Sequence, residues 1–377
     1  MPRIMLIAGE ASGDLHGGGV VRELRALYPQ TEIFGIGGDK MQAEGMRLLH
    51  HVREMSFLGF AEVIKHLPFI RKVLRECERE IVARKPDVLL LIDYPGFNLK
   101  LARMVRRHNV PVIYYISPQV WAWHASRVKQ MKTLIDKMLV IFPFEVPIYE
   151  HEHIPVEFVG HPLLEQIKTD ADPAAAKENF FRQNGFDPSK PLVGVFPGSR
   201  KQEIERMLPV YAAAIERLQG ILPVQAAVGA APTVPLDLIR SYLKNSSIKI
   251  LQDQSASLQR YADVAITKSG TSTLELAIAG TPMVVSYKTS ALSYAIGRTL
   301  AQVDMIALPN IVAGKKIVPE FIQKEATSAH IFAATADLLR NDVKRTQVRR
   351  DLADVRSKLG SPGASRRVAE VIAKYLK

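Results

Sequence analysis

Cysteine is nearly absent from this sequence, with a single residue, Cys77, in 377. One thiol excludes a disulfide framework and a cysteine-rich zinc site, and it is typical of a reducing compartment. Long apolar runs are missing too. None approaches the ~18 residues of a membrane-spanning helix, and the N-terminal run Ile4 to Ala8 is too short for a signal peptide. These absences predict a soluble, cytoplasmic protein.

Several common site motifs are also missing. Gly35 to Gly38 is followed by Asp39 and Lys40, which breaks the glycine spacing of a dinucleotide fold. The sequence has neither the phosphate loop of P-loop NTPases nor the nucleophile elbow of α/β-hydrolases. His151-Glu152-His153 lacks the helical spacing of a zinc pair. We therefore expect no metal site and no cofactor.

The sequence does contain an excess of positive charge. Lys and Arg number 50 against 38 Asp and Glu, which gives a net charge of +12. Hydrophobic residues make up 47%, as in a globular rather than a disordered protein. A basic surface attracts the phosphates of nucleic acids, anionic lipid head groups or phosphorylated metabolites, and charge alone does not choose among these partners.

Short β-branched runs alternate with amphipathic stretches along the chain, which predicts an α/β fold with parallel sheets. Each half opens with a strand, a glycine-containing loop and a helix. We expect two similar domains, at residues 1–168 and 169–350, and a helical segment at 351–377 that packs on either of them. The polar segment Lys168 to Lys190 predicts a linker.

A candidate phosphate site follows the predicted strand Asp263 to Thr267. Its loop offers a cation, a glycine for close backbone approach and several hydroxyls, in the order Lys268, Ser269, Gly270, Thr271, Ser272 and Thr273. A helix start favours an anion, and Glu275 in the first turn suits the vicinal hydroxyls of a ribose. A helix cap with Glu275 completing a capping box explains the same pattern, so the residues alone leave both interpretations open.

Two more strand ends carry candidate residues. Arg200, in a Pro-Gly-Ser-Arg loop, suits a diphosphate through forked hydrogen bonds, unless it is a surface arginine paired with Glu203 or Glu205. Asp93 directly follows the apolar strand Val88 to Ile92. Partial burial there raises the pKa of a carboxyl group and makes it a candidate general base. An Asp that only caps the turn is the alternative.

Aromatic and apolar side chains gather in two other segments. Trp121 and Trp123 follow a predicted strand, and they either line a pocket for a sugar or an acyl chain or belong to the core. Phe57 to Arg75 carries an apolar stripe near helical spacing beside basic residues; its members are Phe60, Val63, Ile64, Leu67 and Leu74. This stripe fits a membrane-surface helix or a core-facing one, and Pro68 interrupts it.

Taken together, these segments resemble the lipid-A-disaccharide synthase family, which are inverting glycosyltransferases of the GT-B architecture. The matching motifs cover nearly the whole chain and are Ala8–Asp14, Met41–Gly45, Lys85–Asn98, Ser117–Trp123, Phe142–Glu145, Phe158–His161, Pro197–Arg200, Ser269–Glu275 and Leu308–Asn310. The resemblance implies two Rossmann-like domains whose parallel sheets face each other across a cleft. The N-terminal domain would serve acceptor and membrane contact, and the C-terminal domain would bind the UDP-sugar.

The family transfers diacylglucosamine from UDP-2,3-diacylglucosamine to the 6-hydroxyl of 2,3-diacylglucosamine 1-phosphate, giving a β(1→6) disaccharide phosphate and UDP. By resemblance, Asp93 is the catalytic base, Arg200 and the Lys268–Thr273 loop hold the diphosphate, and Glu275 holds the ribose. Arg200 also counts as catalytic because its charge stabilises the leaving group. The acceptor side is assigned to Glu10, Ser12, Asp14, Trp121 and Asn310.

Lipid substrates also imply an anionic membrane surface as a partner. The Phe60 to Leu74 stripe would contact it, and the protein would be cytoplasmic and peripherally associated with the inner membrane. A homodimer is left open because no motif indicates one.

Two rival interpretations remain at this point. Another GT-B enzyme, such as a UDP-N-acetylglucosamine 2-epimerase or a lipid-linked peptidoglycan transferase, would share the Ser269 to Glu275 pattern. It is not expected to carry the tryptophan segment or Ile92-Asp93-Tyr94-Pro95. A basic nucleic-acid-binding protein would explain the charge, but the sequence shows no recognition module, so we expect no nucleic-acid partner.

Overall fold

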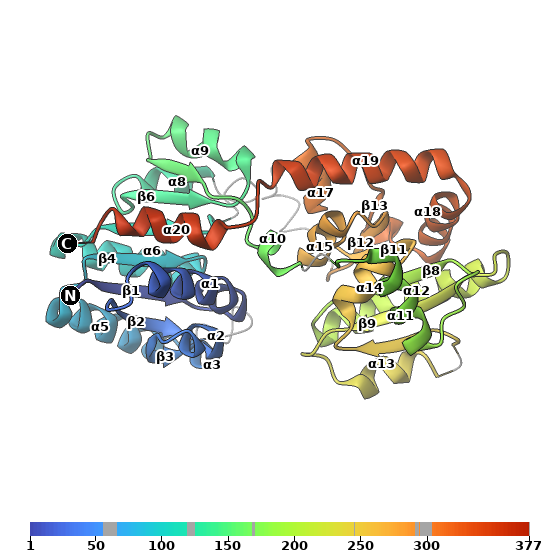
Figure 1. The fold of residues 1–377 in the computed structure, drawn as a ribbon, viewed down its shortest axis with the longest axis horizontal. Helices are drawn as coiled ribbons and strands as arrows, with labels where there is room; N and C mark the ends of the chain where they lie inside the picture. The colour runs from blue at the N-terminus through green and yellow to red at the C-terminus, as the bar shows by residue number, and fades with distance from the viewer. Residues whose placement is uncertain are drawn as a thin grey trace. The chain divides into compact units, whose positions relative to one another are not determined.

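A computed structural model describes residues 1–55, 66–118, 125–167, 170–244, 246–290, 294 and 304–376. Its backbone forms two units (Figure 1), which we call unit 1 (Met1–Glu165 with Leu359–Lys377) and unit 2 (Gln166–Lys358). Each unit contains one parallel sheet, of seven strands in unit 1 and six in unit 2. The predicted α/β class with two parallel sheets is confirmed.

The sheet of unit 1 has the strand order β3-β2-β1-β4-β5-β6-β7. Its strands are β1 (Arg3–Ala8), β2 (Glu32–Gly37), β3 (Arg47–His51), β4 (Val88–Ile92), β5 (Val112–Tyr115), β6 (Lys137–Val140) and β7 (Val156–Phe158). Its helices are α1 (Ala11–Leu27), α2 (Asp39–Ala43), α3 (Val52–Met55), α5 (Leu67–Arg84), α6 (Pro95–Val105), η1 (Arg106–His108), α8 (Ala125–Met131), η2 (Pro143–Glu145), α9 (Val146–His151), α10 (Leu163–Gln166) and α20 (Ala364–Ala373).

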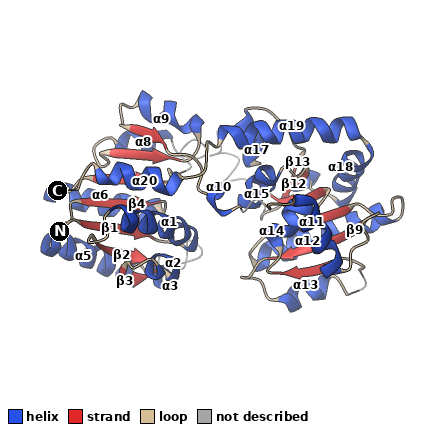
Figure 2. Ribbon diagram, viewed as in Figure 1, coloured by secondary structure: helices blue, strands red, loops and turns tan. Residues whose placement is uncertain are grey.

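Helices cover both faces of this sheet (Figure 2). On one face Met5, Leu89 and Leu91 share a core with side chains of α5 and α6. On the other face α1 lies so close that Gly13 contacts Ala8, and α20 packs against α1 (Figure 1). Burial from both sides explains why all five residues of β4 are apolar and buried.

The helix α5 corrects one predicted membrane contact. Pro68 lies in its first turn, where a missing N–H costs no intrahelical hydrogen bond, so Pro68 starts the helix instead of breaking it. Leu74 is only 6% exposed and belongs to the core of unit 1. The prediction that Leu74 contacts a membrane is therefore wrong. Leu67, at the start of α5, is half-buried.

The sheet of unit 2 has the strand order β10-β9-β8-β11-β12-β13. Its strands are β8 (Leu192–Phe196), β9 (Gln225–Ala230), β10 (Lys249–Gln252), β11 (Val264–Lys268), β12 (Met283–Tyr287) and β13 (Glu320–Ile322). Its helices are α11 (Pro173–Asn184), α12 (Lys201–Gln219), α13 (Leu236–Tyr242), α14 (Ser255–Tyr261), α15 (Thr271–Ala279), α17 (Leu308–Ala313), η3 (Gln323–Glu325), α18 (Ser328–Arg340) and α19 (Asp342–Lys358).

Two segments differ from the predicted organisation. Much of the predicted linker is the helix α11, which Asp172 caps by accepting two backbone hydrogen bonds at 3.0 Å, with Pro173 in the first turn. An acidic cap followed by proline is a helix-start signature. The C-terminal helices are divided between the units, because α19 packs on α15 and α17 whereas α20 packs on α1.

Candidate functional site

Two neighbouring strands of unit 1 end beside each other and present Glu10 and Asp93. β1 pairs with β4 in parallel, with Ala8 opposite Ile92, so the loops that follow leave the same edge of the sheet. Ligands bind at this edge in open α/β sheets. Burial, and then the negative charge of Glu10, raises the pKa of Asp93 to about 6. A carboxyl group with this pKa is suited to general base catalysis.

The backbone at Asp93 is held in an unusual conformation. Asp93 and Tyr94 have φ values of 46° and 47°, a left-handed conformation that costs non-glycine residues about 1–2 kcal/mol each. The Asp93 N–H donates to the carbonyl of Tyr115 at 2.9 Å. The Asp93 carbonyl accepts from Asn98 Nδ2 at 2.7 Å and from the Tyr114 hydroxyl at 2.6 Å. These hydrogen bonds offset the strain.

The aromatic ring of Tyr94 packs against the loop after β1. A Cβ added at Gly9 would lie 2.0 Å from Cδ1 of Tyr94, so only glycine fits beneath this ring. The Tyr94 hydroxyl donates to the carbonyl of Met55 at 2.9 Å. Tyr94 thus connects the loop after β4 both to the loop after β1 and to the end of α3.

The polar residues of the Gly9 to Asp14 segment have different environments. The Asp14 side chain is 5% exposed, and its carboxylate accepts from three backbone N–H groups around the start of α2 at 2.6 to 3.0 Å. Asp14 therefore holds α2, and the prediction that it faces the acceptor is wrong. Glu10 and Ser12 are exposed at the start of α1, and their contact with the acceptor stays a prediction.

The other predicted group lies at the carboxyl edge of the sheet in unit 2. β11 lies between β8 and β12, with Thr267 opposite Phe196 and Lys268 opposite Ser286. The loop carrying Arg200 and the Lys268–Thr273 loop therefore leave the same edge. This arrangement brings Arg200, Lys268 and the start of α15 to the same edge of the sheet, where an anion can bind. The diphosphate site itself stays a prediction.

Glu203 connects these two loops, a role that the sequence did not reveal. One carboxylate oxygen lies 3.0 Å from Lys268 Nζ, and the other accepts from the Ser199 N–H at 3.0 Å. Gly198 has φ 123°, and a Cβ there would lie 2.3 Å from Glu203 Oε2. Arg200 itself is exposed and forms no ion pair among the described residues, so its pairing with Glu203 or Glu205 does not occur.

The hydroxyls of the Lys268–Thr273 loop divide into two groups. Ser269 Oγ donates to the Ile306 carbonyl and Thr273 Oγ1 to the Gly270 carbonyl, both at 2.7 Å. These two hydroxyls stabilise the loop instead of facing a phosphate, which corrects their predicted role as donors. Thr271 is exposed and Ser272 half-buried at the start of α15, where the first N–H groups have no intrahelical acceptor.

The alternative explanation of Glu275 as part of a capping box does not hold. The N-cap of α15 is Gly270, which has no side chain to cap the helix. Glu275 instead accepts a hydrogen bond from Gln259 Nε2 at 2.7 Å through one oxygen. The second carboxylate oxygen accepts no hydrogen bond from any residue that the structure describes, and the side chain is half-buried. Glu275 therefore retains an acceptor for ligand hydroxyl groups.

Asn310 stabilises the fold instead of making the predicted contact with substrate. It is fully buried: Nδ2 donates to the Val318 carbonyl and to Glu320 Oε1 at 2.9 Å, and Oδ1 accepts from the N–H groups of Ile317 at 2.8 Å and Val318 at 3.0 Å. Glu320 in turn accepts from the Ile306 N–H at 3.1 Å. Asn310 thus supports the segment that receives the Ser269 hydroxyl, and the prediction of direct contact is wrong.

Four predicted residues cannot be placed. Trp121, Phe60, Val63 and Ile64 lie outside the described residues. Among the residues that the structure describes, no cluster of three or more His, Cys, Asp or Glu side chains could hold a metal ion. In the same set, no helix combines the length and the apolar character needed to cross a bilayer.

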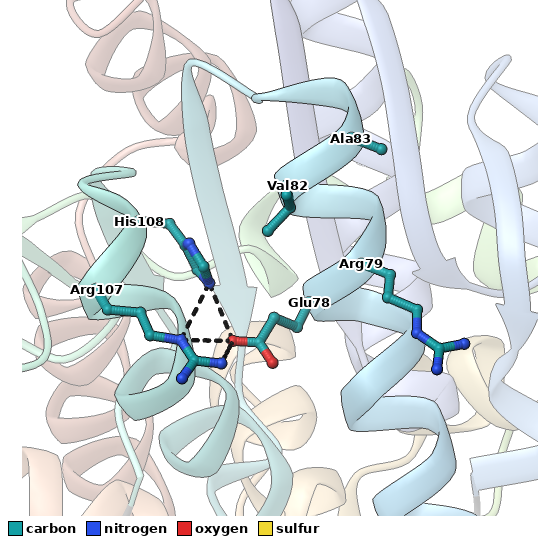
Figure 3. Close-up of a pocket in the computed structure, with 6 residues that line it drawn as sticks. All are labelled: Glu78, Arg79, Val82, Ala83, Arg107 and His108. Atoms are coloured by element: carbon teal, nitrogen blue, oxygen red, sulfur yellow. Dashed lines mark hydrogen bonds and ion pairs between the residues drawn. The ribbon is translucent and has the colours of Figure 1, made fainter.

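A separate surface pocket of about 300 Å³ lies between α5 and η1 (Figure 3). Its lining residues are Glu78, Arg79, Val82, Ala83, Arg107 and His108. The Glu78 carboxylate accepts from Arg107 Nη2 at 2.6 Å and contacts His108 Nε2 at 3.0 Å. Glu78, Arg107 and His108 thus pair with one another, whereas Arg79 has no ion pair among the described residues. Because none of the predicted site residues lines this pocket, we do not count it as part of the site.

Comparison with known proteins places the chain in a family. A model of the family described as lipid-A-disaccharide synthetase matches residues 4–374. A lipid-A-disaccharide synthase of Geobacter sulfurreducens is 43% identical over 381 residues, with 99% of this chain and 97% of the relative covered. One from Geobacter metallireducens is 42% identical over 383 residues, with coverage of 99% and 97%.

Solved structures support the fold. The glycotransferase of kitacinnamycin has a TM-score of 0.67 at 15% identity, with 100% of both chains covered. A UDP-GlcNAc 2-epimerase from Neisseria meningitidis, bound to UDP-GlcNAc, has a TM-score of 0.65 at 12% identity, with coverage of 99% and 100%. At these identities the structures indicate a shared GT-B fold only. Since the family match spans nearly the whole sequence, this chain belongs to the lipid-A-disaccharide synthase family of glycosyltransferases.

Proposed function

We propose that this chain transfers diacylglucosamine from UDP-2,3-diacylglucosamine to the 6-hydroxyl of 2,3-diacylglucosamine 1-phosphate. The products are UDP and a β(1→6) disaccharide 1-phosphate. Family membership supports the substrate class. The observation that carries the chemistry is Asp93, a partly buried carboxyl group with a pKa of about 6 at the carboxyl end of a central strand.

Unit 2 binds the UDP moiety in this proposal. The exposed Arg200 and the first N–H groups of α15 contact the diphosphate. Lys268 adds a second positive charge, although Glu203 already balances part of it at 3.0 Å. The unshared carboxylate oxygen of Glu275 accepts from the ribose hydroxyls. These groups bind the donor and also stabilise the negative charge that develops on the leaving UDP.

Unit 1 provides the base. Asp93 removes the proton of the acceptor 6-hydroxyl while its oxygen forms a bond to C1 of the donor sugar. The bond from C1 to the diphosphate oxygen breaks with its electron pair, so C1 inverts and UDP leaves. The negative charge of Glu10 adds to the effect of burial and keeps the pKa of Asp93 raised. A carboxylate with a higher pKa is a stronger base and is still ionised near neutral pH. Glu10 and Ser12, exposed at the start of α1, contact the acceptor.

The proposal extends to peripheral association with an anionic membrane at the cytoplasmic face of the inner membrane. Arg71, Arg75 and Arg79 recur at four-residue spacing along α5 and are exposed. No ion pair involves them in the part of the chain that the structure describes. A row of unpaired arginines attracts anionic lipid head groups. Leu67, at the N-terminal end of the same helix, is half-buried. Of the two described residues in the Phe60 to Leu74 stripe, Leu67 is the one that supports an apolar contact with the membrane.

The function is tested by turnover of both substrates in detergent micelles containing EDTA, with UDP and disaccharide measured together. Equal amounts of the two products are expected. Release of UDP without disaccharide would indicate hydrolysis or another acceptor. Conversion of UDP-N-acetylglucosamine without any acceptor would favour a 2-epimerase, the activity named for one of the structural neighbours. Absence of donor consumption by folded protein would reject the proposal.

A further inference from the structure

The main-chain carbonyl of Asp93 is held by two buried side chains to which the sequence assigned no role: Asn98, the last residue of the Lys85–Asn98 motif, and Tyr114. We propose that Asn98 and Tyr114 are positioning residues, which fix the left-handed turn at Asp93 and thereby keep its carboxylate partly buried and directed as a base. This inference rests on the proposed role of Asp93. It goes further because it names the side chains that set the orientation and the pKa of the base.

The hydrogen bonds leave the Asp93 backbone little freedom. Its carbonyl accepts from Asn98 Nδ2 at 2.7 Å and from the Tyr114 hydroxyl at 2.6 Å, which uses both lone pairs of the oxygen. Its N–H donates to the Tyr115 carbonyl at 2.9 Å. The φ angle of 46° sets the direction of the Cα–Cβ bond, so the carboxylate moves when this turn relaxes.

The environment of Asn98 indicates that its amide is present for these hydrogen bonds. Asn98 is fully buried in the first turn of α6, and Nδ2 also donates to the Ile92 carbonyl at 3.2 Å. Its Oδ1 is buried and has no hydrogen-bond partner among the described residues. An unpaired buried amide oxygen is unfavourable, and an apolar side chain would avoid it. The hydrogen bonds that Asn98 donates to the carbonyls of Ile92 and Asp93, at the carboxyl end of β4, are therefore what this asparagine contributes.

Loss of these donors has a specific consequence for the base. The turn relaxes toward an ordinary φ, and the carboxylate gains contact with water. Since burial is the main cause that raises the pKa of Asp93 to about 6, the pKa falls toward its ordinary value. The base is then both misdirected and weaker. The donor-binding groups all lie in unit 2, so the KM for the UDP-sugar stays unchanged.

The test compares Tyr114→Phe and Asn98→Ala with Tyr115→Phe as the matched control. The Tyr115 hydroxyl is buried on the same strand and, within the described part of the chain, forms no hydrogen bond. We expect kcat to fall about tenfold or more in each of the first two variants, with the KM for the UDP-sugar within about twofold. The acid limb of the pH–rate profile should move to lower pH. Tyr115→Phe should match the wild type in all three.

The test remains decisive if Asn98→Ala does not fold. Tyr114→Phe then decides alone, because it removes one hydroxyl and keeps the ring. Wild-type kcat and an unshifted pH profile in Tyr114→Phe would overturn the inference. Tyr114→Phe combined with Asp93→Ala should turn over no more slowly than Asp93→Ala, whereas a further loss would mean a general structural role. Full turnover in Asp93→Ala alone would instead refute the proposed base.

Discussion

The Glu203 carboxylate lies 3.0 Å from Lys268 Nζ, and both side chains are only 18% exposed. The same carboxylate accepts from the N–H of Ser199, next to Arg200. Through this pair, the loop after β8 is tied to the loop after β11. The position of Arg200 therefore depends on Glu203, which holds the residue before it.

Replacing Glu203 with alanine should weaken UDP binding about tenfold, as expected when an ion pair that orders a binding loop is lost. The Ser199 N–H loses its acceptor, and the loop carrying Arg200 becomes disordered before binding. Titration calorimetry with UDP measures the change. Glu205→Ala is the control, since the one ion pair of Glu205 with a described residue is to the exposed Lys201, at 3.8 Å. UDP binding by Glu203→Ala as tight as in the wild type would contradict a positioning role for this pair.

Asp93→Asn should reduce kcat by at least about 10²-fold, the usual scale for loss of a general base, and leave the affinity for UDP unchanged. In the wild type, kcat/KM should decrease as the pH falls through about 6, because protonation of Asp93 removes the base. Initial rates between pH 5 and 8 test this profile. A loss of UDP affinity in Asp93→Asn would show that Asp93 belongs to the donor site.

The same substitution should stabilise the folded protein at high pH. The folded-state pKa of about 6 lies above the ordinary value of 3.8, so the ionised carboxylate is less favourable in the folded state than in the unfolded state. This penalty is fully present above the folded pKa and disappears below the ordinary one. We expect Asp93→Asn to raise the free energy of unfolding by about 3 kcal/mol at pH 8 and hardly at all at pH 3.5. Urea denaturation at the two pH values provides the measurement.

Asn310→Ala should lower the free energy of unfolding by about 2–4 kcal/mol, because several buried hydrogen bonds lose a partner at once. It should also weaken UDP binding, since Asn310 supports Glu320 and through it Ile306, whose carbonyl receives the Ser269 hydroxyl. Denaturation and calorimetry on one preparation separate the two effects. Ser269→Ala is the comparison: it should weaken UDP binding with a smaller loss of stability. Normal UDP affinity in folded Asn310→Ala would disconnect Asn310 from the loop.

Membrane association should depend on the exposed arginines of α5 and not on Leu74. Replacing Arg71 and Arg75 with glutamate should reduce binding to vesicles containing anionic lipid, at about 1 kcal/mol per arginine near the surface, with little change in stability. Leu74→Ala should instead destabilise the protein by about 2–4 kcal/mol through a core cavity. Vesicle sedimentation at low and at physiological salt tests the first part. Unchanged binding by the double variant would place the membrane contact elsewhere.

The central strands β4 and β11 could be predicted closely, and the edge strands of unit 1 could not. Val88–Ile92 forms a strand at the predicted bounds, and β11 differs by one residue at each end from the predicted Asp263 to Thr267, because a strand covered on both faces needs an uninterrupted apolar run. β3, with the sequence Arg47–His51, and β7 lie at the two edges of their sheet. Their residues are mostly half-exposed. These strands therefore need no uninterrupted apolar run, and their short sequences show no hydrophobic pattern that predicts a strand.

For the site, the sequence by itself determined which chemical groups are present and that they follow strands. The order of motifs also sufficed to indicate the family and the GT-B fold, since family resemblance depends on many positions together. Asp93, Arg200 and Glu275 could be chosen because chemistry at strand ends is a local signal. The pKa of Asp93 depended on the burial and charge that the packing of β1 against β4 provides.

Only the tertiary structure decided which polar residues face a ligand and which support the fold. Asp14, Asn310 and Ser269 have the residue types of a binding site, yet each forms hydrogen bonds with backbone groups of neighbouring segments, and Asn310 also with the Glu320 side chain. Asn98 and Tyr114 meet at one carbonyl oxygen although they lie on different elements. A side chain's hydrogen-bond partners are set by which segments pack beside it, and that information is spread over the whole chain instead of residing in any one motif.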